Sequence, residues 1–456
     1  MATAVPAGPA IIPRSGLLRV LGLGFTLALG IGAMIGGGIL RTPGSVVAQV
    51  PLPWLALLLW ALAGFHALLT ANIVAEVMTS VPKSGGLFNV AERAFGNIGA
   101  LLVGWADWLL TVAAIAALSI ACAEFLALIV PGVGRHITAT GIGITVLLFA
   151  LNWIGVREGS LAQIVASAAK ALLLLGLIFL IFAFRPPAEA VTAAAPAAAP
   201  IGFFALVVAY QLIIGAYNGW ANTVYFAEED RNPERNIPRA LFGTIFAVMA
   251  IYLLMNGALL YALPVDRLST AELPVAMAIE DIFGRSSVTV VAIIAVVTVV
   301  GCINASIMIA SRIMHGLGRD GFLPAATAHV NRGGTPDVAM ALAAVVAIAL
   351  ALSGEFETVF LVLAAFALFV LVLVDLAFFK LRFSEPELPR PYRAKFYPWL
   401  PALALLIDLA VLLAFLASDL RSALFMAIAV ALCIPLSMIA KRGRARLNNR
   451  AAADPR

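Results

Sequence analysis

Charged residues are scarce in this chain of 456 residues: they make up 12% of it, whereas 63% of its residues are hydrophobic. A soluble globular protein carries about 25% charged residues. This composition therefore excludes a protein whose whole surface faces water, and we expect an integral membrane protein. The net charge of +5 then bears on membrane sidedness, and we expect no nucleic-acid partner.

Reactive and metal-binding groups are also few. The three cysteines, Cys122, Cys302 and Cys433, lie in apolar runs without a close pair, which excludes a disulfide framework and a cysteine metal site. The four histidines are scattered along the chain. Because the sequence contains no nucleophile elbow and no Walker loop, we expect no enzyme activity, no cofactor or metal, and no direct use of ATP.

Long apolar runs are what the chain has in abundance. A helix needs about 20 apolar residues to cross a bilayer, and the sequence contains twelve such runs. They cover residues 19–48, 53–80, 98–130, 137–154, 161–184, 202–226, 239–263, 287–315, 338–354, 357–380, 398–417 and 420–440. We therefore predict an all-α membrane protein with twelve transmembrane helices, grouped as five spans (19–184), five spans (202–380) and two last spans (381–440).

The basic residues are distributed unevenly between the two sides of this arrangement. With the N-terminus inside, 22 lysines and arginines lie in the inner segments and 6 lie in the outer ones. Basic residues concentrate in cytoplasmic loops, so we predict that both termini are cytoplasmic. Residues 1–18 are then a cytoplasmic N-terminus, residues 185–201 an outer linker and residues 441–456 a basic cytoplasmic tail. We expect a plasma membrane, and the compact, alanine-rich chain suits a bacterial inner membrane.

The first span contains three consecutive glycines, in GAMIGGGIL, although each glycine weakens a helix by about 1 kcal/mol. One interpretation is a broken helix that lines a cavity, because only there is an unwound backbone tolerated in a membrane. The other is close helix packing, since Gly32 and Gly36 have the GxxxG spacing. The sixth span favours the first interpretation, because GAYNGWAN (215–222) interrupts it at the corresponding position of the second group.

Two such breaks predict a binding site for an amino acid. Five spans are an odd number, so the second group of five enters the membrane from the opposite side, and the groups form inverted repeats. At a break, the free N–H groups of a helix N-terminus suit a carboxylate. The freed carbonyl groups suit an ammonium group. We therefore predict that helices 1 and 6 are discontinuous and bind one zwitterion between them.

Four stretches resemble the amino acid–polyamine–organocation (APC) transporters, which have the leucine-transporter (LeuT) fold. They are GAMIGGGILRTPGSV, AEVMTSVPKSGGLFNVAERAFG, YNGWANTVYFAEEDRNPERNIPRA and SRIMHGLGRDGFLP, in this order along the chain. The resemblance implies secondary active transport of amino acids or related amines by alternating access. It also implies that the substrate carboxylate binds at Ile35, Gly36, Gly37 and Gly38, and that the amine and side chain face Ala216, Tyr217, Asn218, Gly219 and Trp220.

One position departs from the family pattern. Many relatives have a carboxylate directly after the Gly-aromatic pair of helix 6, where this chain has Ala221. The missing acid argues against a cationic substrate.

Lys170 lies deep within the fifth span, where a charge costs about 2.5–3.5 kcal/mol. The resemblance places it behind helix 1, where sodium-coupled relatives hold a cation. We therefore hypothesise that Lys170 couples transport to protons, with sodium coupling the less favoured mode. Snorkelling to the interface is the alternative. Asn304 and Ser306 in the eighth span could face Lys170 and helix 1.

Four other polar residues within spans are weaker candidates. We expect Glu76 to pair with a cation of a loop, His66 to be a packing residue with its hydrogen bonds satisfied, and Asp107 to make a structural hydrogen bond or line an inner vestibule. Glu124 lies toward the outer end of its span.

The predicted function is symport or exchange of small amino acids, with proton-coupled symport as the favoured mode and an amino acid/amine exchanger as the alternative. In this alternative, an amine or polyamine exchanger, Asp107 or Glu124 would replace the missing acid. A channel would need a continuous polar stripe and a nutrient sensor would need a soluble domain, and the sequence shows neither. It does not specify the oligomeric state.

Overall fold

The computed structural model describes residues 21–83, 85–154, 159–184, 201–227, 230–331, 335–352 and 356–418, together with residues 420, 423–428, 430–433 and 435. Within these residues the chain is helical, with no strand beyond an isolated backbone bridge between Leu21 and Asp230. The all-α prediction is therefore confirmed. The predicted termini (1–18 and 441–456) and the linker, apart from residue 201, lie outside the described residues.

The helices follow the expected apolar runs closely. They are α1 (Leu23–Met34), α2 (Gly37–Gln49), α3 (Pro53–Ser80), α4 (Phe88–Ala127), η1 (Pro131–Arg135), α5 (Ile137–Ile154), α6 (Gly159–Ala183), α7 (Phe203–Tyr217), η3 (Trp220–Phe226), α8 (Pro233–Ala262), α9 (Val265–Thr270), α10 (Pro274–Phe283), α11 (Arg285–Arg319), η4 (Ala325–Ala328), α12 (Asp337–Ala351), α13 (Phe356–Ser384) and α14 (Trp399–Ser418).

Eight helical segments of the described chain are long and apolar enough to cross a membrane. Shorter apolar helices lie at the positions of the remaining expected spans: Ile137–Trp153, Ser167–Ala183, Asp337–Ala351 and Ala423–Cys433.

Two helices begin well before the residues that the sequence predicts. α4 begins ten residues before the expected 98, and Gly96, at φ 70°, separates its first part from the span itself. α8 begins at Pro233 rather than 239, because a proline at the first helical turn and Glu234 beside the helix N-terminus extend it into polar sequence. The helices α9 and α10 were not expected. A prediction from apolar runs detects only the part of a helix that lies in lipid, so it misses polar helix ends and short helices outside the membrane.

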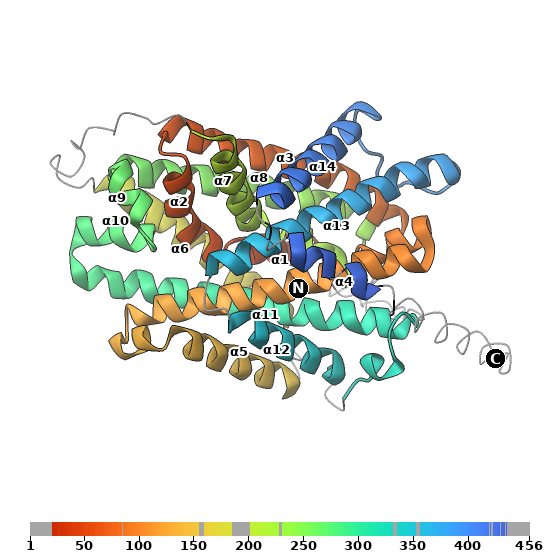
Figure 1. Cartoon of the computed structure of the whole chain (residues 1–456), viewed down its shortest axis with the longest axis horizontal. Helices are drawn as coiled ribbons and strands as arrows, with labels where there is room; N and C mark the ends of the chain where they lie inside the picture. Colours follow the sequence, from red (N-terminus) through yellow and green to blue (C-terminus); the bar gives the residue numbers. More distant parts are fainter. Residues whose placement is uncertain are drawn as a thin grey trace, which may run out of the picture.

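The long helices α4, α11 and α13 run side by side through the molecule (Figure 1), and α4 packs against both of the others. The helices α5 and α12 pack against α4 and α11 on the side that faces away from α13. The two broken spans run antiparallel, since α2 packs on α7 while α1 packs on η3. Their unwound segments therefore meet at the middle of the helix bundle.

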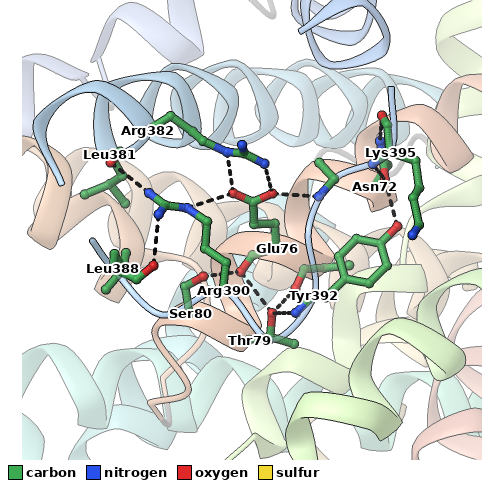
Figure 2. Close-up of polar contacts among 12 residues, drawn as sticks. Asn72, Glu76, Thr79, Ser80, Leu381, Arg382, Leu388, Arg390, Tyr392 and Lys395 are labelled. Atoms are coloured by element: carbon green, nitrogen blue, oxygen red, sulfur yellow. Dashed lines mark hydrogen bonds and ion pairs between the residues drawn. The ribbon is translucent and has the colours of Figure 1, made fainter. Parts of the chain in front are cut away.

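One end of the bundle, which we call the basic end, holds Arg93, Arg319 and Arg382. The end of α3 is fastened there by Glu76, whose two oxygens accept hydrogen bonds from Arg382 at 2.7 and 2.5 Å. Arg390 pairs with the same carboxylate at 3.1 Å, and the backbone N–H of Ala394 donates to it at 2.6 Å. Figure 2 shows Glu76 between the two guanidinium groups. The expectation that Glu76 pairs with a cation of a loop is confirmed by Arg390.

Candidate functional site

The first break separates α1 from α2 at Ile35 and Gly36, both of which have extended backbone angles. The first N–H groups of α2, beginning at Gly37, have no helical acceptor, and they carry the positive end of the helix dipole. Gly38 brings α2 close to α7, because a Cβ atom there would lie 3.0 Å from the Cα atom of Ala216. The discontinuity predicted for helix 1 is therefore present.

The second break ends α7 at Tyr217. Asn218 is extended and Gly219 has a φ of 112°, a left-handed conformation that glycine adopts without strain. A Cβ atom at Gly219 would also lie 3.2 Å from the backbone of Ala33 in α1. The chain continues as the 3₁₀ helix η3 from Trp220. Helix 6 is therefore discontinuous as predicted, and the carbonyl end of α7 faces the amide end of α2.

Tyr252 of α8 holds the two breaks together. Its hydroxyl lies 2.6 Å from the carbonyl oxygen of Met34 at the end of α1 and 3.0 Å from that of Ala216 near the end of α7. The side chain is completely buried. Because helix ends leave carbonyl groups without helical donors, this single hydroxyl serves both broken ends.

A small cavity of about 50 Å³ lies between the breaks. Its lining includes Gly36, Gly38, Ala216, Asn218, Gly219 and Ser306. A second cavity of about 70 Å³ shares Asn218, Gly219 and Ser306 with the first and is also lined by Tyr217 and Trp220. The structure thus brings residues of both predicted half-sites to one connected region.

Two of the predicted residues contribute backbone instead of cavity surface. A Cβ atom on Gly37 would meet Ala121 and Leu118 of α4 at 3.3 Å, so this glycine allows close helix packing. The carbonyl oxygen of Ile35 lies 3.1 Å from the thiol of Cys302, on the other side of the break.

Lys170 of α6 lies behind the first break. Its ammonium nitrogen is 3.4 Å from the carbonyl oxygen of Gly32 and 3.6 Å from the sulfur of Cys302, and the side chain is 4% exposed. Gly301 provides the space for this ammonium group, because a Cβ atom at position 301 would lie 2.6 Å from its nitrogen. A cation at this place faces the negative end of the α1 dipole. The lysine therefore does not snorkel to the interface.

Asn304 of α11 has a partner on α5. Its side-chain oxygen accepts a hydrogen bond from Asn152 of α5 at 2.7 Å. Ser306, two positions later, lines both cavities.

Asp107 lines the second cavity, where it accepts a 2.6 Å hydrogen bond from the hydroxyl of Tyr225. Glu124 forms an ion pair with Arg41 of α2. The guanidinium group of Arg41 also lies 4.7 Å from the ring centre of Phe356. Glu124 is therefore paired with Arg41, at the end of the bundle away from the basic end. Of these two acids, Asp107 is the one that lines a cavity.

Packed aromatic rings lie on both sides of the breaks. Phe360 of α13 lies against Gly38 and Gly215, and it also lines the smaller cavity. Toward the basic end, Phe25 and Phe226 pack edge to face with ring centres 5.7 Å apart, and the guanidinium group of Arg312 lies 4.7 Å from the ring centre of Phe226. Of these rings, Phe360 borders the site between the breaks.

A family model described as amino acid permease matches residues 21–440. The chain belongs to the amino acid permease family. This family consists of transporters and not of enzymes, as the sequence predicted.

Characterised relatives cover most of the chain. The chain is 29% identical to the serine/threonine exchanger SteT of Bacillus subtilis, over 90% of this chain and 93% of SteT. It is 28% identical to the human b(0,+)-type amino acid transporter 1, over 87% of this chain and 82% of that protein. The branched-chain amino acid permease BcaP of Bacillus subtilis is 24% identical, over 87% of this chain and 88% of BcaP.

Sequence analysis of this permease missed Tyr252 and Phe360. Both are aromatic residues among others in long apolar runs, where their sequence context is that of ordinary packing residues. A tyrosine in the middle of a span is a weak signal, since its hydroxyl needs a partner there. Nothing in the sequence indicates that this partner is a pair of helix ends.

Proposed function

We propose that this chain is a secondary transporter that binds one small amino acid between its two broken helices and moves it by alternating access. The observation that carries the proposal is the meeting of two opposite helix ends at one cavity. The amide end of α2 suits the carboxylate of the substrate, and the carbonyl end of α7 suits its ammonium group. Ile35 to Gly38 and Ala216 to Trp220 remain the proposed binding segments.

A small neutral side chain fits this site best. The cavity between the breaks has a volume of only about 50 Å³, and Phe360 lies at its edge. The similarity to an exchanger named for serine and threonine agrees with that size.

The packing of the helices supports inverted repeats and twelve spans. In the proposed repeat, α3 corresponds to α8, α4 to α11 and α5 to α12, and each of these helices contacts its counterpart. The antiparallel packing of α1 and α2 on η3 and α7 extends the same relation to the first span of each repeat. The two last spans, of which α14 is the first, lie outside the repeat.

We further infer that the basic end faces the cytoplasm. The assignment of 22 basic residues to this side follows the rule for cytoplasmic loops. Both termini then lie in the cytoplasm. The membrane that we propose is a plasma membrane, namely the inner membrane of a bacterium.

Lys170 supports coupling to protons over sodium, because its ammonium group occupies the carbonyl-lined position behind the first break. Loss of its proton would remove the charge from the end of α1 and weaken the contact that holds this half-helix. The amine or polyamine exchanger remains the second candidate. It is favoured by Asp107, a buried acid that lines the second cavity and could receive a cationic side chain.

Uptake into proteoliposomes tests the proposal. A panel of radiolabelled amino acids is offered with and without an inward proton gradient. Accumulation only with the gradient supports symport, whereas uptake only into preloaded vesicles supports exchange. Failure of correctly inserted, folded protein to transport any amino acid would refute the proposed function.

Two matched pairs of variants tie transport to the geometry. Gly38→Ala should lower substrate binding, because the added Cβ atom would lie 3.0 Å from the backbone of Ala216, whereas Gly24→Ala in α1 meets nothing within 4 Å and should leave binding unchanged. Lys170→Met should abolish gradient-driven uptake. Lys380→Met should not, because Lys380 contacts the ring of Phe95 at the basic end.

A further inference from the structure

A buried polar cluster lies where α3, α7, α13 and α14 meet. His66 of α3 bridges two of these helices. Its Nδ1 atom is 3.1 Å from the hydroxyl of Tyr210 in α7, and its Nε2 atom is 2.8 Å from an oxygen of Asp408 in α14. The hydroxyl of Thr70, one turn further along α3, lies 3.3 Å from the other oxygen of Asp408. Asp375 of α13 faces Asp408 and completes the cluster.

The charges of this cluster do not balance. Asp375 and Asp408 are both 0% exposed, and His66 is the one basic side chain among the cluster residues. Neither oxygen of Asp375 has a hydrogen-bond donor among the described residues. Two ionised carboxylates can only accept hydrogen bonds, so no bond joins Asp375 to Asp408 until one of them takes up a proton. In a medium of low dielectric constant, a shared proton relieves both the repulsion and the burial of charge.

The cluster can be reached from the larger cavity. His66 and Thr70 line this cavity together with Tyr217 of the second break. A proton from water in the cavity therefore meets His66 before it meets either carboxylate. Among the described residues, the titratable groups that face the cluster or share its cavity lie on five helices. They are Tyr210 and Tyr217 on α7, Asp375 on α13, Asp408 on α14, Asp107 on α4 and Tyr225 on η3.

The cluster is also connected to the substrate site through α7. Tyr210, whose ring stacks on that of His66 with centres 6.2 Å apart, lies about two helical turns before Tyr217, the last residue of α7. A change in the hydrogen bond between His66 and Tyr210 therefore acts on the same helix whose carbonyl end forms the second break.

We propose that His66, Asp408 and Asp375 form a proton-binding site separate from Lys170, and that its occupancy biases the position of α7. The proton adds to Nδ1 of His66, the imidazolium passes its Nε2 proton to Asp408, and the proton is then shared with Asp375. The imidazole returns to its neutral form, and no redox step is involved. The binding of the proton stands on the cluster alone, whereas its coupling to transport rests on the proposed function.

Infrared difference spectroscopy of the purified protein in lipid nanodiscs tests the site without substrate or gradient. Acidification should produce the C=O stretching band of a buried protonated carboxyl group. This band should be lost in Asp375→Asn, which leaves the contact between His66 and Asp408 in place. His66→Gln should slow or shift its appearance. Asp107→Asn is the matched control, since Asp107 is a buried acid on the same cavity, and the band should persist in that variant.

Three results would overturn the inference. One is a titrating band that survives Asp375→Asn and disappears in Asp107→Asn. Another is the absence of any carboxyl band that responds to acid in the folded wild-type protein. The third is a saturable response to sodium at constant pH that requires Asp375, which would make the cluster a metal-cation site. If the band titrates as expected but proteoliposomes transport no amino acid, the proton site stands and the proposed function fails.

Discussion

Glu76 and the pair Asp375–Asp408 are two buried carboxylate sites on the same helices, and they are built in opposite ways. Glu76 and His66 both lie on α3, and Arg382 and Asp375 both lie on α13. At the basic end, one carboxylate meets two guanidinium groups and a backbone N–H (Figure 2). Within the bundle, Asp408 meets one imidazole and one hydroxyl group, and the neighbouring Asp375 meets no donor among the described residues.

The difference separates a structural polar site from one suited to titration. Every oxygen of Glu76 is matched by a donor, so a proton added there would break charge-assisted hydrogen bonds. At Asp375 a proton would create a hydrogen bond where none exists. Burial alone therefore does not identify a titrating group; the balance of donors and acceptors around it does.

The largest expected effect is that of Glu76→Ala. Removal of this carboxylate leaves Arg382 and Arg390 without their shared partner in a largely buried place, which should destabilise the fold by about 3–5 kcal/mol. Thermal or denaturant unfolding of the protein in detergent measures this loss. Glu76→Gln keeps the shape and one acceptor oxygen, and should lose less. Equal, small losses in both variants would mean that the charge-assisted hydrogen bonds of Glu76 contribute little to the fold.

The opposite sign is expected at Asp375. Asp375→Leu removes a buried carboxyl group that lacks a donor, so the stability should stay equal or rise, by up to about 4 kcal/mol. Asp408→Leu should destabilise, since it leaves His66 and Thr70 without their partner. The same unfolding assay compares them, and Asp375→Asn serves where leucine overpacks the site. A large loss of stability in both Asp375 variants would show that this carboxyl group is paired after all.

A smaller effect is expected at Tyr392, whose hydroxyl donates to Asn72 at 2.7 Å beside Glu76. Tyr392→Phe should cost about 0.5–1.5 kcal/mol. Burial and the charge of Glu76 raise the pKa of Tyr392 to about 12 from an ordinary value of 10.0. The raised pKa means that the protonated phenol stabilises the fold below pH 10 and that this contribution is lost as the pH approaches 12.

Unfolding of wild type and Tyr392→Phe at neutral and at strongly alkaline pH measures this difference. The gap between the two proteins should narrow as the pH rises. A gap that is constant over this range would mean that Tyr392 does not sense the charge of Glu76.

The smallest effect is expected at the exposed pair of Arg93 and Glu385, whose closest atoms are 2.6 Å apart. Glu385→Gln should change stability by about 0–1 kcal/mol. The hydrogen bond from Arg93 lowers the pKa of Glu385 below its ordinary value of 4.5, so the pair stabilises the fold above that pH and loses its effect in stronger acid. High salt should further reduce the contribution of this ion pair to stability. A loss as large as that of Glu76→Ala would mean that exposure does not distinguish these two ion pairs.

Particular elements show how far the sequence could be interpreted. The run at 137–154 coincides with α5, and the glycine-rich interruptions coincide with the ends of α1 and α7. The pairing of Glu76 with a cation was also predictable, because an acid at the end of a span needs a nearby partner. The placement of Lys170 behind helix 1 was implied by family resemblance, and residue spacing alone would not have indicated it.

Other elements could not be predicted. The hydrogen bond between Asn304 and Asn152 of α5 is one of them, because the rotation of α11 about its axis depends on its neighbours and not on its own sequence. His66 was expected as a packing residue, and it does have both ring nitrogens satisfied; its two titratable partners come from α7 and α14.

The sequence by itself determined where the long apolar helices lie and where two of them break. In hydrocarbon each backbone group must find its partner locally, so apolar length and glycine position are sufficient signals. Only the tertiary structure decided which polar side chains meet. His66 and Asp408 are 342 residues apart in sequence, and Tyr252 reaches Met34 across 218 residues. Such contacts depend on how helices pack side by side, and an apolar run contains little information about its neighbours.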